Sequence, residues 1–342
     1  KGKYNFKFNI FFAKKILNNY LCYSHSNSTT LCRPRLNSQT RQHSVNPDSL
    51  DSLLQTMRKP TAILLVSCPD QLGLIHAITK FLSQHHGNIV QLSEHVERPD
   101  NIFFFRVEWE LDTFGIPQKD IERELKKSLF SKYQMRWELY FTHEKPKMAV
   151  FASQSSHCIY DIFSRYFSDE WFVDIPAIIS NHRSHEELAQ KYGIPFHYFE
   201  INAQNKAEQE AHQLKLLQRL GIDFMVLARY MQILSPEFVA NFENKIINIH
   251  HSFLPAFAGA KPYHRAFERG VKIIGATSHY VTQNLDEGPI IEQSVAKVSH
   301  KDSIEDLKIK GRDIEKLVLS RAISLHLQRR VLVHKNKTVV FE

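Results

Sequence analysis

The sequence has no long apolar run and only four cysteines. No apolar stretch among its 342 residues reaches the length that a helix needs to cross a bilayer, so a membrane-spanning protein is not expected. The cysteine positions match neither a disulfide framework nor the spacing of zinc ligands. They are Cys22, Cys32, Cys68 and Cys158. The apolar content of 43% is that of an ordinary globular protein, long enough for two domains.

Acidic residues are absent from positions 1–47, which contain eight lysines and arginines. The formal net charge of the whole chain is also +8, so the remainder is close to neutral and lacks the basic surface of a nucleic-acid binder. An acid-free segment rich in Asn, Ser, Thr and Arg is typical of an organelle transit peptide, although a disordered basic tail is the alternative. We therefore predict a leader and linker at 1–59 and a mitochondrial protein, with the chloroplast as the alternative.

Residues 60–144 predict a small domain of four strands and two helices. Apolar runs and alternating segments indicate the strands, and apolar residues at helical spacing indicate the helices. Strands are expected at 62–67, 88–95, 101–110 and 134–142, and helices at 74–85 and 117–129. The order strand-helix-strand-strand-helix-strand is the ferredoxin-like plan.

From residue 145 to 342, strands and helices alternate, which predicts an α/β domain with a doubly wound, mostly parallel sheet. Residues 223–227 are so apolar that this strand should be central. A long helix is expected over 303–332. Ligands of such sheets bind beyond the carboxyl ends of the strands, so residues at these ends are the first candidates for a site.

Polar side chains occur at one such strand end. Residues 245–250 alternate like a strand leaving a buried sheet, so Asn248 and His250 point to the same face. Asp286 lies on a later loop. An amide, an imidazole and a carboxylate can together bind an oxyanion, relay a proton and orient a water, which is what reactions at a carbonyl carbon require.

The longer string around these residues resembles a known signature. Residues 248–255 (NIHHSFLP) are similar to the motif of the formyltransferase-fold family, whose members handle 10-formyltetrahydrofolate. Residues 275–281 (GATSHYV) and 285–291 (LDEGPII) continue the likeness, which looks like that of one branch, the formyltetrahydrofolate deformylases. The resemblance runs from about residue 61 to 342. It implies hydrolysis of 10-formyltetrahydrofolate to formate and tetrahydrofolate, which balances the one-carbon folate pool used in purine biosynthesis.

The resemblance also suggests roles for the residues. Asn248 would donate to the oxyanion, because its NH₂ group does not titrate. His250 would contact the oxyanion and relay a proton to the departing nitrogen, and Asp286 would orient the water and favour the charged imidazole. The structural alternatives are a core histidine and a turn-capping aspartate. The implied folate slot is lined by Met231, Gln232, Leu234 and Thr282. Folate is then the substrate, and no separate cofactor is expected.

One departure from the wider family favours water as the formyl acceptor. Transferase relatives that act on a phosphorylated ribosyl amine carry a Gly-rich loop after the first strand, where backbone N–H groups bind phosphate. Residues 153–158 (SQSSHC) contain no glycine at that place. Formyl transfer to an amine acceptor such as glycinamide ribonucleotide remains one alternative, and a non-catalytic amino-acid sensor is another.

The first turn of the small domain resembles that of an ACT domain, a regulatory module that often binds amino acids between paired copies. The likeness lies in residues 68–74 (CPDQLGL). It implies an effector site at Asp70, Gly73 and Asn88 and a homo-oligomer formed through this domain. The alternative is that Gly73 only relaxes a tight turn and the domain serves dimerisation alone.

Several histidines near the motif raise the question of a metal site. Adjacent His250 and His251 face opposite ways on a strand, and the spacings to His264 and His279 match no common ligand pattern. No metal is therefore expected. Cys158 opens a predicted helix in apolar surroundings, which favours a buried thiol over a nucleophile.

Overall fold

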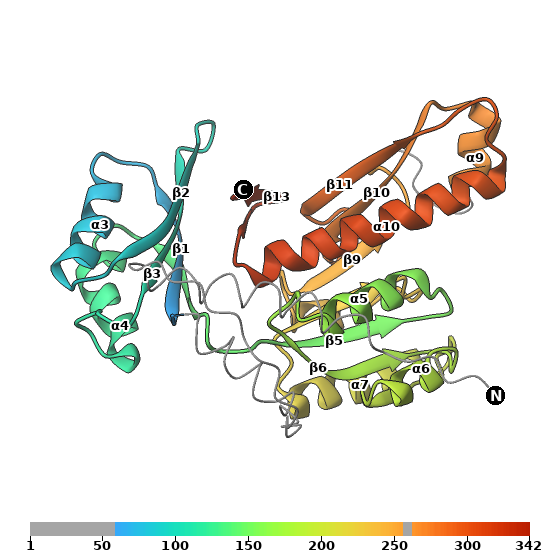
Figure 1. The fold of residues 1–342 in the computed structure, drawn as a ribbon, viewed down its shortest axis with the longest axis horizontal. Coiled ribbons are helices and arrows are strands. Elements are labelled where there is room, and N and C mark those ends of the chain that lie inside the picture. Colours follow the sequence, from blue (N-terminus) through green and yellow to red (C-terminus); the bar gives the residue numbers. More distant parts are fainter. Residues whose placement is uncertain (1–58, 256–261) are drawn as a thin grey trace, which may run out of the picture. The chain divides into compact units, whose positions relative to one another are not determined.

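The computed structural model describes residues 59–255 and 262–342 of the chain (Figure 1). The predicted leader and linker lie outside these residues, except for Lys59. Within the described part, no helix combines the length and the apolar character that crossing a bilayer requires. The strands of this part form a four-stranded sheet, a seven-stranded sheet and a two-stranded hairpin.

The four-stranded sheet is antiparallel, with the spatial order β2-β3-β1-β4. Its elements are β1 (Thr61–Pro69), α3 (Leu74–Gln84), β2 (Ile89–Glu97), β3 (Ile102–Glu110), α4 (Gln118–Leu125), the π-helical η1 (Lys126–Phe130) and β4 (Arg136–Phe141). This order confirms the predicted ferredoxin-like plan. The exact domain boundaries at 59/60 and 144/145 stay predictions.

Strand β1 is central because both of its faces are apolar. Ala62, Leu64 and Val66 face α3 and α4 and join one buried cluster with them. Leu65 points the other way and packs with Phe104 and with Phe341 from the C-terminal end of the chain. Helix α3 presents to the sheet a stripe of buried residues at helical spacing. These are Leu74, Ile78, Phe81 and Leu82.

The seven-stranded sheet has the order β11-β10-β9-β8-β5-β6-β7. The five strands from β5 to β9 are parallel, and β10 pairs in antiparallel fashion with both β9 and β11, which confirms the predicted mostly parallel α/β fold. The strands are β5 (Lys147–Ala152), β6 (Asp174–Ser180), β7 (Phe196–Tyr198), β8 (Phe224–Ala228), β9 (Ile246–His250), β10 (Ile273–Tyr280) and β11 (Ile290–Lys297). As predicted, the apolar β8 is internal and buried throughout.

Helices cover both faces of this sheet. The helices are α5 (His157–Phe167), α6 (Glu186–Lys191), α7 (Lys206–Leu220), α8 (Pro236–Ala240), α9 (Pro262–Arg269) and α10 (Ile304–Leu327). Helices α5 and α10 share one buried cluster with the sheet, and α7 and α8 share another on the opposite face. In Figure 1, α10 runs along the layer of β9, β10 and β11. The strand order reverses direction between β5 and β8, where doubly wound sheets bind ligands.

Helix α10 is shorter than predicted. It begins with a capping box between Ser303 and Asp306, as a helix start should, but it ends at Leu327 instead of continuing to 332. Arg329 adopts a left-handed backbone with φ of 54°, which stops the helix. The chain then forms a hairpin of β12 (Val331–His334) and β13 (Lys337–Val340). The prediction of a helix up to residue 332 is therefore wrong at its end, where the chain forms a short strand.

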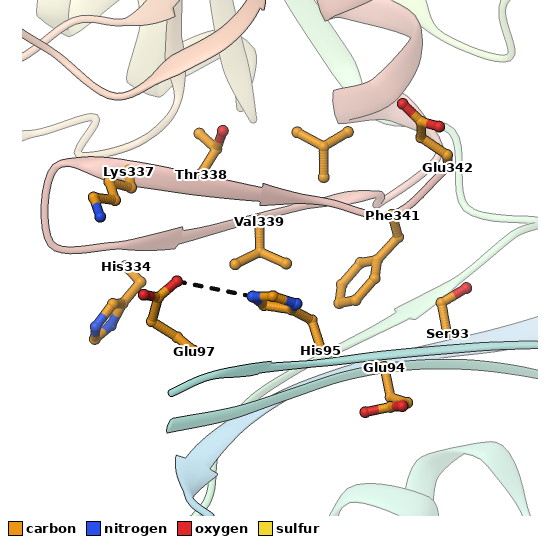
Figure 2. A pocket seen from close by; sticks show the side chains of 11 residues that line it. Ser93, Glu94, His95, Glu97, His334, Lys337, Thr338, Val339, Phe341 and Glu342 are labelled. Atoms are coloured by element: carbon orange, nitrogen blue, oxygen red, sulfur yellow. Dashed lines mark ion pairs between the residues drawn. The ribbon is translucent and has the colours of Figure 1, made fainter. Parts of the chain in front are cut away.

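The C-terminal hairpin lies over the face of the four-stranded sheet that α3 and α4 leave open. Figure 2 shows this contact, with Val339 and Phe341 of the C-terminal segment facing His95 of β2. Between the hairpin and β2 is a cavity of about 390 Å³. Its lining mixes acidic and basic side chains, among them Glu97 and Lys337. The hairpin thus fastens the end of the chain to the small domain.

Arg106 of β3 forms the most buried polar part of this contact. It is 2% exposed and donates to the carbonyl oxygens of Arg329 (3.0 Å) and Gln328 (3.1 Å), just beyond the end of α10. It also donates to Glu108 at 3.0 Å and to Gln91 at 2.8 Å. A guanidinium suits this place because it offers five donors and satisfies carbonyls that a helix end leaves unpaired.

We expect Arg106→Met to lower the free energy of unfolding by about 2–3 kcal/mol, because it removes charge-assisted hydrogen bonds and leaves buried carbonyls unpaired. Chemical denaturation followed by circular dichroism measures this. Arg123→Met is the matched control, since the Arg123 side chain is 69% exposed on α4 and should change stability by less than about 0.5 kcal/mol. Equal free energies of unfolding for the two variants would contradict a stabilising role for the buried hydrogen bonds of Arg106.

Candidate active site

Asn248 and His279 face each other across two neighbouring strands. They are directly paired in the antiparallel register of β9 and β10, and Asn248 Nδ2 lies 3.2 Å from His279 Nε2. His279 Nδ1 lies 2.9 Å from the carbonyl oxygen of Tyr280, which can only accept, so Nδ1 carries a proton. Burial lowers the pKa of His279, in keeping with a neutral ring. Nε2 therefore accepts from Asn248 and orients the amide.

His250 and Asp286 form the second pair of the site. His250 Nδ1 lies 3.2 Å from Asp286 Oδ1. The hydrogen bond from His250 lowers the pKa of Asp286 and outweighs the opposing effect of burial, so the carboxylate stays ionised. The other ring nitrogen, His250 Nε2, is buried and has no partner within the described residues. Since buried polar atoms are rarely left unpaired, this atom is available to a bound molecule.

Asp286 reaches the site because its loop folds tightly back on β10. At Gly288, a Cβ atom would lie 1.8 Å from the carbonyl oxygen of Tyr280, so a larger residue cannot be accommodated there. Asp286 itself has a positive φ of 58°, which an aspartate tolerates better than most residues. Its Oδ1 is 3.8 Å from His279 Nε2, too far for a hydrogen bond. The carboxylate is thus directed to His250.

The chain leaving β9 is held by hydrogen bonds to β10 and β11. Thr277, paired with His250 across the strands, accepts from the backbone N–H of Leu254 and donates to the carbonyl of Ser252. Gln293 of β11 donates to Thr277 at 2.9 Å and to the carbonyl of Leu254 at 3.1 Å. These contacts fix where the strand ends, and so where the rings of the two consecutive histidines lie.

The structure therefore brings Asn248, His250 and Asp286 together. It adds His279, for which the sequence pattern had suggested only a possible role as a metal ligand. A signal for it existed, because residues 273–280 alternate like a strand, but the register against β9 decides which residue meets Asn248. That register is a property of the folded sheet.

The predicted folate residues lie in two loops. After β8, the backbone N–H of Met231 is bound by the Ser153 hydroxyl at 2.9 Å, and that hydroxyl is 2.7 Å from Asn181 Oδ1. Met231 is exposed and Gln232 partly so, whereas Leu234 is buried in the cluster of α7 and α8. Ile233, which was not predicted, is an exposed apolar residue of the same loop. On the other loop, Thr282 donates to the carbonyl of Asn284.

The predicted effector residues do not meet within one chain. Asp70 and Gly73 precede α3, and Asn88 follows it; an 11-residue helix is about 16 Å long. Gly73 has a φ of 91°, and open space lies around the position of its missing Cβ. Asn88 donates to Glu110 at 3.0 Å. A single copy of the chain thus provides two separate halves of the predicted site.

One cluster of potential metal ligands occurs among the described residues. Atoms of His157, Cys158 and Glu315 lie within 4.8 Å of one another. The Glu315 carboxylate is already occupied by His157, Tyr263 and Arg229, and the guanidinium 3.4 Å away would repel a cation. Burial raises the pKa of the Cys158 thiol, which disfavours the thiolate that a metal or a nucleophilic role requires.

Two family models match the chain. A formyl transferase model covers residues 146–323, and an ACT domain model covers residues 62–129. The chain is 50% identical to a formyltetrahydrofolate deformylase of Synechocystis over 83% of its length and 100% of the relative's. For that of Bacillus subtilis the identity is 48%, over 81% and 93%. The crystal structure of a Pseudomonas syringae formyltetrahydrofolate deformylase matches with a TM-score of 0.82 and 41% identity, over 86% of this chain and 99% of that one.

The predicted mitochondrial localisation, with the chloroplast as its alternative, is wrong. The relatives at 48–50% identity come from bacteria, which have no such organelles. The prediction rested on the composition of a segment that lies outside the described residues. Composition alone does not distinguish a transit peptide from another basic segment, because many basic segments share the same residue types.

Proposed function

Because this chain belongs to the formyltetrahydrofolate deformylase family, we propose that Asn248, His250 and Asp286 carry out its reaction. That reaction is the hydrolysis of 10-formyltetrahydrofolate to formate and tetrahydrofolate. The folate is the substrate, and the proposal includes no separate cofactor. The observation that carries the assignment is the buried Nε2 of His250, which has no partner among residues 59–255 and 262–342 and lies beside an amide and a carboxylate.

The proposed reaction begins with attack of a water oxygen on the formyl carbon, with Asp286 orienting the water. The carbonyl oxygen then carries negative charge, which the second amide N–H of Asn248 and the Nε2–H of His250 stabilise. The C–N bond breaks as His250 gives its proton to the departing nitrogen. Water supplies the hydroxyl of formic acid, and its second proton replaces the one that His250 lost. Formic acid ionises to formate.

The pterin is proposed to bind against the loop that follows β8. Met231 and Gln232 would contact the ring together with Thr282, while Leu234 supports the loop from the core below. Met231 and Ile233 support this proposal, because exposed apolar side chains on a loop at the switch point of the sheet suit a flat ring. The hydrogen bond from the Met231 backbone to Ser153 holds the loop in place.

Hydrolysis is tested by measuring formate release from 10-formyltetrahydrofolate by the purified protein without any amine. Steady release at more than about 1 s⁻¹, a common turnover rate for enzymes, is the expected result. Release that requires added glycinamide ribonucleotide would instead indicate formyl transfer. No release under either condition would favour the remaining alternative, a non-catalytic amino-acid sensor. The glycine-free loop at 153–158 supports hydrolysis, since it lacks the backbone cradle for the phosphate of an amine acceptor.

The ACT domain is proposed to bind an amino-acid effector between two copies of the chain. The separation of Gly73 and Asn88 by the length of α3 supports a shared site, in which each copy provides one half. Strand β2 is an edge of its sheet and exposes Val90 and Leu92. An exposed edge strand with apolar residues is suited to pairing with a second chain.

We expect Leu92→Glu to convert the oligomer into monomers, because a charge at the edge strand disfavours pairing. Size-exclusion chromatography with light scattering measures the mass. Leu317→Glu is the matched control, since Leu317 on α10 is as exposed (39%) as Leu92 (38%) and should leave the mass unchanged. A wild-type chain that is monomeric, or a Leu92→Glu variant of unchanged mass, would refute assembly through this edge.

A further inference from the structure

A second buried cluster of charged residues lies on the face of the sheet opposite Asn248, and the proposed reaction does not use it. It contains Arg229, at the end of β8, and Glu315 of α10, which is 2% exposed. His157 of α5 and Tyr263 of α9 complete it. Side chains from three other parts of the chain thus converge on the carboxylate of Glu315. Burying charged groups costs free energy of desolvation, so a buried cluster of this kind indicates a structural or functional role.

Glu315 is the centre of this cluster. Its carboxylate is 2.8 Å from His157 Nε2, accepts from the Tyr263 hydroxyl at 2.8 Å and lies 3.4 Å from Arg229 Nε. Burial alone would raise the pKa of Glu315, but these partners outweigh it and hold the pKa below its ordinary value. At Gly311, one turn earlier on α10, a Cβ would lie 2.0 Å from the Tyr263 hydroxyl. The absence of a side chain there lets Tyr263 reach Glu315.

Arg229 connects this cluster to the active site through His251. Its Nη1 lies 2.7 Å from His251 Nδ1. A guanidinium has donors only, so His251 Nδ1 must be the acceptor, and the ring is neutral with its proton on Nε2. Arg229 holds this position with a φ of 60°, a left-handed backbone that is uncommon for arginine.

His251 in turn stacks on His250. The ring centroids are 5.0 Å apart and the planes differ by 20°. The prediction that these neighbours face opposite ways is wrong, because β9 ends at His250 and the alternation of a strand ends with it. Two stacked imidazoles at this distance repel each other when both are charged, so a charge on one ring disfavours a charge on the other.

We propose that Arg229 is a positioning residue that keeps His251 neutral and so assigns the proton of the stacked pair to His250. The inference rests on the proposed role of His250 as the proton donor. Glu315 holds Arg229 in place, with Tyr263 and His157 as its other partners. The cluster then determines which of the two adjacent rings, His250 or His251, acts as the general acid.

The charges around His251 agree with this assignment. Arg229, His250, Glu315 and Asp286 all face it, from the end of β8, from β9, from α10 and from the loop after β10. Burial and the Arg229 charge lower the pKa of His251 to about 4, although Glu315 and Asp286 act in the opposite direction. Burial lowers the pKa of His251 even without Arg229, but the two carboxylates then favour a proton on this ring with no guanidinium to oppose them.

The tautomer is tested independently of activity by NMR of protein labelled with ¹⁵N-histidine. The signals of His251 are identified by their loss in His251→Phe. At pH 7 the wild type should show a neutral His251 with a bare Nδ1 and a protonated Nε2. In Arg229→Met the same ring should become cationic. A cationic His251 in the wild type, or a ring that stays neutral in Arg229→Met, overturns the proposal whatever the role of His250.

Kinetics then test the consequence. Arg229→Met should lower kcat about 100-fold at pH 7, as expected when a general acid loses its proton, and change KM less than about threefold. The double variant Arg229→Met/His251→Phe should recover at least about tenfold in kcat and reach the level of His251→Phe, because phenylalanine keeps the ring but cannot take the proton. Arg219→Met, an exposed arginine at the end of α7, is the control for loss of a positive charge.

The results distinguish a failure of the role proposed for Arg229 from a failure of the role proposed for His250. A double variant no faster than Arg229→Met, or a loss expressed mainly in KM, would show that Arg229 serves only to hold the loop after β8. If the NMR result is as expected but His250→Ala keeps full activity, the proposed role of His250 fails and the tautomer assignment stands. Thermal unfolding of each variant identifies any that is slow because it does not fold.

Discussion

Asn248→Ala should reduce kcat about 100-fold to 1000-fold, because the amide is the neutral donor placed to stabilise the oxyanion. KM should change little, since the substrate's uncharged carbonyl gains less from this donor than the transition state does. Formate release under saturating and limiting folate measures both constants. The variant should fold normally, because Asn248 is only partly buried and its side chain makes one hydrogen bond, to His279, in the described residues.

Two further variants sharpen this test. Asn248→Asp keeps the shape but replaces the donor by a carboxylate, which faces the lone pair of His279 Nε2 and repels an oxyanion. It should be at least as slow as Asn248→Ala. Asn241→Ala changes an exposed asparagine that contacts only the backbone of Glu237 in the hydrogen bonds described, and should keep wild-type kcat. An Asn248→Asp enzyme close to wild type would exclude the oxyanion role.

Asp286→Asn should reduce kcat about 1000-fold to 10,000-fold. The amide can donate to His250 Nδ1 where the carboxylate only accepts, so it favours the wrong tautomer; loss of a carboxylate behind a catalytic histidine costs about this much in a well-studied protease triad. The substitution also removes the group proposed to orient the water. Asp313→Asn on α10, 65% exposed and paired with Lys316, is the matched control. A loss below tenfold would exclude Asp286 from the reaction.

The same variant has a predictable effect of pH on stability. The pKa of Asp286 is lowered in the folded protein, chiefly by the hydrogen bond from His250, so the carboxylate binds fewer protons folded than unfolded. Its stabilising contribution is therefore complete above the unfolded value, about 3.8, and is lost as the pH falls through the lower folded value. The difference in unfolding free energy between wild type and Asp286→Asn should be constant from pH 5 to 8 and shrink below pH 4.

The active-site residues differ in how far they could be predicted. Asn248 and His250 follow from strand periodicity, which places residues two apart on one face, and from the chemistry of their side chains. Asp286 came from the family resemblance, because no local pattern links a loop residue to a histidine 36 positions earlier. His279 could not be assigned a role, since its contact with Asn248 depends on cross-strand register. Arg229 and Glu315 gave no signal at all.

Local sequence determined the elements and the order in which they alternate, because apolar spacing and capping residues act over a few positions. The layered plan of each domain follows from that order, as does the pair of polar residues at the end of β9. Only the tertiary structure decided what lies beside them. The position of Arg229 beside His251, the carboxylate of Glu315 beneath Arg229 and the packing of the C-terminal end against β1 and β3 all depend on contacts between distant segments. Such contacts form only when the whole chain buries its apolar surface, so they leave no periodic trace in the sequence.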